Sequence, residues 1–242
     1  QAQRLLLERQ DKSVIPAVKT LFFHSEDPRF RLHAIYVLEG MNALDADIVK
    51  KAMKDPSAGV RENAAILSER FPACLSQLEG MIDDSSVRVA FQAALSLGDF
   101  KDKTVVPALA KVVAQRGQSA WFRTAVLSSE AGSSIDLLNE LDKKGSFFDA
   151  AAPWKTGFLE DFSNVIGRRD QKKQIIAVLE MISKPSLSKT ADWELACVKG
   201  LIKGQERIEG LNAALKEKLK SIEEESGADI KKAIGDLKQL YM

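Results

Sequence analysis

The chain of 242 residues has few of the residue types that break helices or cross-link segments. It contains 14 glycines, seven prolines and two cysteines. So little glycine and proline excludes collagen-like chains and Pro/Gly-rich disordered chains, and it predicts few tight turns. Cys74 and Cys197 are far apart and have no Cys-x-x-Cys spacing. We therefore expect two small buried apolar side chains, not a disulfide bond or a pair of metal ligands.

Neither sign of charge is in excess, and long apolar runs are missing. The sequence has 35 Lys and Arg against 34 Asp and Glu, a formal net charge of +1. This balance gives no general attraction to nucleic acid or to an anionic membrane. No apolar run approaches the roughly 18 residues of a membrane-spanning helix, and the first residues do not form a signal peptide. We expect no direct membrane insertion, and a segment excised from a longer protein, because Gln1 opens the chain inside a plausible helix.

Motifs that carry catalysis are also missing. There is no Gly-rich phosphate loop, no G-x-S-x-G and no H-E-x-x-H. The two histidines, His24 and His33, are too few for a zinc site, which usually needs three or four ligands, so we expect structural roles for both. Paired acids such as Asp83 and Asp84 are expected in turns and helix caps, not as glycosidase carboxylates. The sequence thus predicts no catalytic residue, no metal and no cofactor.

Internal repeats are the strongest positive signal. Residues 11–18, DKSVIPAV, return as residues 102–109, DKTVVPAL. A second motif, an apolar residue followed by arginine, recurs about every 30 residues, and its first three copies follow an acidic turn. The members of this arginine series are Arg31, Arg61, Arg88 and Arg123. Two interleaved series with one period predict a repeat protein.

Each unit has the pattern of two helices. In the first unit, Val14 and Val18 lie on one helical face. Ser13 stands where an N-cap is expected, and Pro16 then falls in the first turn, where its missing N–H costs nothing. The acidic turn ends this helix, and its aspartate can cap the next one. The second helix is rich in small residues and reaches Gly40, a candidate C-cap.

The predicted fold is therefore all-α: a right-handed α-solenoid (an ARM/HEAT-like superhelix) of about six short helix-pair repeats, with a C-terminal helical cap. No segment alternates with period two over a useful length, so no sheet is expected. We assign the whole chain, 1–242, to a single HEAT-like repeat domain. The predicted repeats span about residues 12–44, 45–72, 73–100, 102–132, 134–168 and 170–204, and the cap spans 206–242.

Six segments in a fixed order resemble a known family. They are RLHAIYVLEG (31–40), GVRENA (59–64), FQAALSLG (91–98), WFRTAVLSS (121–129), VIGRRD (165–170) and WELACVKGL (193–201). Together they resemble the HEAT-repeat domain of large bacterial, planctomycete-type, membrane-associated dehydrogenase-like proteins. In that family the domain lies between a sugar-dehydrogenase-like β-propeller and a c-type haem domain. The resemblance implies a non-catalytic scaffold that positions neighbouring modules of a periplasmic or extracytoplasmic protein. This chain has no Cys-x-x-Cys-His and cannot attach a c-type haem covalently.

Two sets of residues are candidates for binding a protein partner. Second helices usually line the concave face of a HEAT solenoid, and a groove that mixes charges with aromatics suits a protein better than DNA. This groove set comprises Arg31, His33, Arg61, Glu62, Asn63, Arg88, Gln92, Trp121 and Arg123. The other set lies in an aromatic segment, residues 145–162, that interrupts the period, and it comprises Phe147, Phe148 and Trp154. The alternatives are that the arginines pair with turn aspartates of their own or the neighbouring unit, and that the aromatic segment folds over its own core.

Two other functions remain open from the sequence. Some HEAT-like solenoids of similar size are DNA glycosylases, which should carry a basic groove with Trp and Tyr. Here charge is balanced in both halves of the chain, with three Trp and two Tyr in total. A bilin-lyase-like chaperone for a tetrapyrrole is the other alternative. The balanced charge and the small number of Trp and Tyr favour a scaffold that binds protein and no nucleic acid.

Overall fold

Helices and the turns between them make up the structure, a computed structural model that describes residues 2–101, 103–143, 147–149, 152–169, 171–182 and 191–204. These ranges contain thirteen α-helices and no strand, which confirms the all-α prediction. None of these helices is both long and apolar enough to cross a membrane. The predicted cap, residues 206–242, lies outside the described residues. The chain divides into two compact units, residues 1–100 and 101–242, which are described separately.

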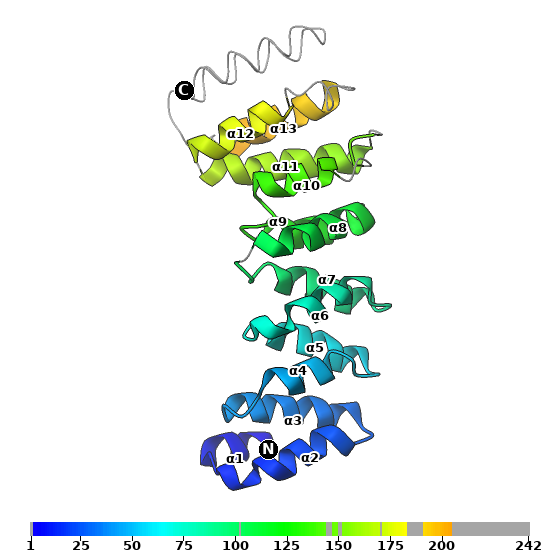
Figure 1. Ribbon diagram of the computed structural model, residues 1–242, viewed down its shortest axis with the longest axis vertical. Coiled ribbons are helices and arrows are strands. Elements are labelled where there is room, and N and C mark those ends of the chain that lie inside the picture. Colours follow the sequence, from blue (N-terminus) through cyan, green and yellow to red (C-terminus); the bar gives the residue numbers. More distant parts are fainter. Residues whose placement is uncertain are drawn as a thin grey trace. The chain divides into compact units, whose positions relative to one another are not determined.

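The first unit is a series of helix pairs preceded by one short helix. Figure 1 shows its helices following one another in chain order. They are α1 (Ala2–Arg9), α2 (Ile15–His24), α3 (Pro28–Gly40), α4 (Ala46–Ala52), α5 (Ala58–Ser68), α6 (Leu75–Gly80) and α7 (Val87–Leu97). Within each pair α2 contacts α3, α4 contacts α5 and α6 contacts α7. The second helices form a row, since α3 also packs on α5 and α5 on α7.

Aspartates in the acidic turns start the second helices. Asp27 is the N-cap of α3 and accepts a hydrogen bond from the backbone N–H of Arg29 at 2.9 Å. Asp55 and Asp84 lie two residues before Ser57 and Ser86, the N-caps of α5 and α7. Each carboxylate accepts a hydrogen bond from the backbone N–H of that serine at 2.8 Å. The turn and capping role predicted for these acids is confirmed.

The ends of the first helix pair differ from the prediction. Ser13 lies inside a short 3₁₀ turn before α2, and Asp11 caps that turn by accepting the Ser13 N–H at 2.9 Å. The left-handed residue after α3 is Asn42, with φ of 52°, because asparagine tolerates this conformation. Gly40 is instead the last residue of the helix, where a Cβ would lie 2.6 Å from a methyl group of Leu7. This glycine therefore permits α1 to approach α3.

Alanines allow the second helices of the first unit to pack closely. The side chains on their packed faces are at most 2% exposed at Ala34, Ala64, Ala65, Ala93 and Ala94. Larger apolar side chains such as Leu38 and Leu97 fill the space between the helices. Burial of such surface stabilises the unit by about 25 cal/mol per Å².

In the second unit, helices two places apart in chain order pack on one another and form two rows. The unit contains α8 (Val106–Arg116), α9 (Ala120–Leu127), α10 (Ile135–Lys143), α11 (Pro153–Arg169), α12 (Lys172–Ile182) and α13 (Ala191–Gly204). One row is α8, α10 and α12, and the other is α9, α11 and α13. Contacts of α8 with α9 and of α12 with α13 join the rows. Thr104, which matches Ser13 in the repeated segment, lies inside the 3₁₀ turn Lys103–Val105 before α8.

Glycines bring α11 and α13 together. A Cβ at Gly200 would lie 2.2 Å from the carbonyl oxygen of Glu160, and one at Gly204 would lie 2.5 Å from that of Asn164. Both distances are too short for any side chain, so the backbones can approach only where Cβ is missing. The Gly-x-x-x-Gly spacing, which can be read in the sequence, places both glycines on one face of α13.

Candidate interaction surface

Arg31 connects the first helix pair to the second. Its Nε and Nη2 atoms donate to the two carboxylate oxygens of Asp55, both at 2.7 Å. Its Nη1 atom donates to the carbonyl oxygens of Ser25 and Glu26 at 2.8 and 2.9 Å. Both charged side chains are largely buried. The guanidinium therefore closes the turn of its own pair and holds the turn of the next pair through a bidentate ion pair.

Arg61 repeats these contacts one pair later. Its Nε and Nη2 atoms donate to Asp84 at 2.7 and 2.9 Å, and Nη1 donates to the carbonyl oxygens of Asp55 and Pro56 at 2.8 and 3.0 Å. The hydrogen bonds to Asp84 raise the pKa of this guanidinium, and those to Asp55 raise the pKa of Arg31 in the same way. In both arginines the charge is neutralised by an aspartate of the next helix pair, which agrees with the alternative that the arginines pair with turn aspartates of a neighbouring repeat.

Arg88 does not occupy the same position. It lies two residues after the N-cap of α7, whereas Arg31 and Arg61 lie four residues after theirs, and Ala90 takes the equivalent place. Its side chain is 80% exposed and pairs with Glu62 at 2.7 Å. Arg88 therefore does not repeat the pairing with a turn aspartate that Arg31 and Arg61 show, because the apolar–Arg motif recurs there at a different distance from the helix start.

Arg123 keeps half of the arrangement. Its Nη1 atom donates to the carbonyl oxygens of Gly117 and Gln118 at 2.8 and 3.2 Å, as in the first unit. Its Nε atom is buried and has no hydrogen-bond partner within the part of the chain that the structure describes. On the same helix, Trp121 is 75% exposed while Phe122 is buried. The start of α9 thus fixes its turn internally and presents one large aromatic ring to solvent.

Two further residues of the groove set are bonded within the first unit. Asn63 accepts a hydrogen bond from the Tyr36 hydroxyl at 2.7 Å, which joins α3 to α5. Burial and the carboxylate of Glu39 raise the pKa of Tyr36. His33 is exposed, and its Nδ1 atom lies 2.7 Å from Oε1 of Gln3.

Gln92 belongs to a polar chain that links α7 to α5. It donates to the Ser96 hydroxyl at 3.0 Å, and that hydroxyl donates to Glu69 at 2.6 Å. Burial raises the pKa of Glu69, the Ser96 hydrogen bond lowers it, and the hydrogen bond and charge of Asp99 raise it. The net direction is upward, so this carboxyl group holds its proton more strongly than a solvated one.

The aromatic segment is packed onto its own unit. Phe147 is buried, and its ring meets the rings of Phe148, Trp154 and Phe158 edge to face at 4.9, 5.8 and 5.9 Å between centroids. The ammonium group of Lys155 lies 5.3 Å from the same ring. These contacts agree with a segment that folds over its own core, with Phe148 and Trp154 partly exposed.

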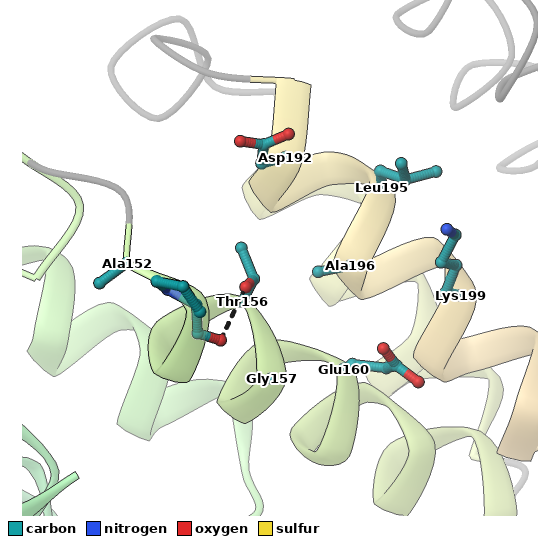
Figure 2. Close-up of a pocket in the computed structure, with 9 residues that line it drawn as sticks. Ala152, Thr156, Gly157, Glu160, Asp192, Leu195, Ala196 and Lys199 are labelled. Atoms are coloured by element: carbon teal, nitrogen blue, oxygen red, sulfur yellow. Dashed lines mark hydrogen bonds between the residues drawn. The ribbon is translucent and has the colours of Figure 1, made fainter. Parts of the chain in front are cut away.

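A hollow of about 570 Å³ opens between α11 and α13. Figure 2 shows Thr156 and Glu160 along α11, and Asp192, Leu195 and Lys199 along α13. The Thr156 hydroxyl donates to the carbonyl oxygen of Pro153 at 2.9 Å, so it already serves the first turn of its helix. The remaining lining consists of small apolar and charged residues, which do not form a nucleophile with an adjacent base. The hollow therefore gives no support to catalysis.

Cysteines and metal-ligand residues also lack a reactive arrangement. Cys74 and Cys197 are free and buried, as predicted, and burial raises the pKa of Cys197 to about 12. Within the described ranges, no group of three His, Cys, Asp or Glu side chains could hold a metal ion. Comparisons with protein-family models, with curated proteins and with solved structures found no match to this chain.

Proposed function

We propose that this chain is an ARM/HEAT-like α-solenoid of about six short repeats that acts as a non-catalytic scaffold and binds protein. The shared contacts of Arg31 and Arg61 support repetition, because each guanidinium closes its own turn and grips the aspartate of the next. The two rows of alternating helices in the second unit support the same architecture.

The observation that carries a binding role is the exposure of Trp121. A tryptophan that is 75% exposed leaves a large apolar surface in water, and tryptophan is among the residues that contribute most to protein interfaces. Its helix is held in place, since Phe122 is buried against the guanidinium of Arg116, 5.3 Å from the ring centroid. A rigid aromatic side chain loses little conformational freedom when a partner covers it.

Neutralised arginines favour a protein partner over DNA. A DNA-binding groove needs cationic side chains that are free to contact phosphates. Arg31 and Arg61 are largely buried and are paired with Asp55 and Asp84. They would have to break these ion pairs before they could contact a nucleic acid.

The resemblance to dehydrogenase-associated HEAT domains extends the proposal to a cellular context. In that context the partner is a neighbouring module of the same extracytoplasmic protein, or another protein bound to it. A scaffold of this kind holds modules at a fixed separation without taking part in their chemistry.

Photo-crosslinking in the native cell tests the proposal. A photoreactive amino acid replaces Trp121 in the full-length protein, and the matched control replaces Ala114, an exposed residue of α8. We expect adducts with protein from position 121 and far fewer from position 114. Adducts with nucleic acid, or none, would contradict a protein-binding role. So would a salt-dependent mobility shift with duplex DNA at micromolar protein, or a change in tetrapyrrole absorbance on mixing.

A further inference from the structure

Two equivalent positions flank the turn of each helix pair in the first unit, and both are apolar in all three pairs. The first lies two residues before Ser25, Asp55 or Asp84, and the second lies three residues after the N-cap of the second helix. Their occupants are Phe23 and Phe30 in the first pair, Met53 and Val60 in the second, and Ile82 and Val89 in the third. Phe23 and Phe30 are 50% and 54% exposed, whereas the other four are at most 3% exposed.

The difference in exposure follows from which helix packs against each turn. The bond from Arg31 to Asp55 places the turn of the second pair against the start of α3, and Arg61 places the third turn against α5 in the same way. The first turn has no such neighbour among the residues that the structure describes. The preceding helix, α1, meets the other end of α3, where Leu7 contacts Gly40. Phe23 and Phe30 therefore form an open end face, the Phe23/Phe30 face.

The polar groups of this face define what can cover it. Ser25 stands where the later pairs have Asp55 and Asp84, and its carbonyl oxygen already accepts from Arg31. An arginine from a covering helix would find no carboxylate at this point. The nearby Asp27 is paired with Arg29 of the same chain at 2.6 Å. The face therefore fits an apolar surface that brings no unpaired charge to the position of Ser25.

We propose that the Phe23/Phe30 face is a self-association surface that the same face of a second copy of this chain covers. The face of a second copy brings no unpaired charge to the position of Ser25, since it consists of two aromatic rings and a neutral serine. Glu26 is exposed at its edge, and Arg29, although paired with Asp27, is 84% exposed, so a twofold axis can place the Arg29 guanidinium of one copy opposite the Glu26 carboxylate of the other. Twofold contacts between identical patches are the commonest kind of oligomer interface. A patch centred on two phenylalanines is small, so the dimer is reversible.

Sedimentation of the whole chain tests this inference. We expect the mean mass to rise from 26.6 kDa toward twice that value as protein concentration increases from about 1 to about 500 µM. Phe23→Glu and Phe30→Glu variants should stay monomeric across this range. Val87→Glu is the matched control, because it places the same charge on an apolar residue of α7 that is 62% exposed, and it should dimerise like the unaltered chain.

A second measurement guards against variants that fail to fold. In the unaltered chain, amide exchange of residues 21–31 should slow at high concentration, while that of residues 120–127 should not change. A mass that stays at the monomer value at all concentrations overturns the inference. So does a dimer that persists in both Phe variants, or one that only Val87→Glu abolishes. The protein-binding role of Trp121 would survive each of these results.

Discussion

Arg61 donates two nearly parallel hydrogen bonds to Asp84, at 2.7 and 2.9 Å, from one helix pair to the next. The same carboxylate accepts the backbone N–H of Ser86 at 2.8 Å, just before α7 begins. One guanidinium thus closes the turn before its own helix and fixes the turn before the following helix. This double role gives the repeated arginine a structural reason, independent of any ligand.

Gly200 sets the distance between α11 and α13, so Gly200→Ala should destabilise the chain. A Cβ at this position would lie 2.2 Å from a backbone oxygen of Glu160, which cannot move without shifting its helix. We expect a loss of about 2 to 4 kcal/mol in the free energy of unfolding, measured with chemical denaturant. Gly157→Ala on α11 is the control, because a Cβ there meets nothing within 4 Å. It should stabilise the helix by about 0.5 to 1 kcal/mol, and equal losses in both variants would contradict the packing described.

Glu69 should destabilise the folded chain when it is ionised. Its pKa is raised, chiefly by burial, so the folded state binds this proton more tightly than the unfolded state does. The resulting loss of stability is absent below the usual pKa of glutamate and develops as pH rises through the raised value. Glu69→Gln should therefore raise the free energy of unfolding by up to about 1 kcal/mol near pH 8, and by less near pH 4. Denaturant unfolding at both pH values checks this, with the exposed Glu130→Gln as control; a gain that is larger at low pH would refute it.

Asp27 should remain ionised to unusually low pH. The hydrogen bond from the Arg29 side chain, with that from the Arg29 backbone, lowers the pKa of this carboxyl to about 2. Its contribution to stability is therefore present above the usual aspartate value and is lost as pH falls through about 2. Carboxyl-carbon NMR should give this midpoint, and Arg29→Gln should raise it toward the usual value. A midpoint that Arg29→Gln leaves unchanged would show that the pair does not form in solution.

Cys197 and Cys74 should be inert in the native protein. Both are buried, and burial raises the pKa of each thiol, that of Cys197 to about 12. The thiolate is the reactive form, so alkylation near pH 8 should proceed only as fast as the chain unfolds. Mass spectrometry after timed labelling, with and without denaturant, measures this. Rapid modification of either cysteine without denaturant would be inconsistent with the packing around it.

Periodicity and capping chemistry were enough to predict an all-helical chain and several of its turns. Asp27 caps α3 because a short carboxylate before Pro28 satisfies a free N–H of the first turn. That local preference can be predicted from the sequence. The alanines of the second helices were equally informative. Their small size matters only where two helices approach closely, and Ala64 and Ala65 are both fully buried.

The candidate binding residues were harder to predict, because exposure depends on helix register. Val60-Arg61 and Val87-Arg88 look alike in sequence, yet the first arginine faces the next turn and the second faces solvent. A difference of two positions from the N-cap rotates a side chain to the opposite face of a helix. A step of one position, a rotation of about 100°, separates exposed Trp121 from buried Phe122. Local motifs cannot show which side a neighbouring helix will cover.

A double-mutant cycle on Arg61 and Asp84 tests most directly whether these arginines hold successive helix pairs together. Unfolding free energies of Arg61→Met, Asp84→Asn and the double variant should give a coupling of about 1 to 3 kcal/mol, since the pair is bidentate and largely buried. The matched cycle on exposed Arg88 and its partner, with Arg88→Met and Glu62→Gln, should give at most about 0.5 kcal/mol. A coupling for Arg61 and Asp84 no larger than that of the exposed pair would contradict the structural role and would return these arginines to the candidates for binding.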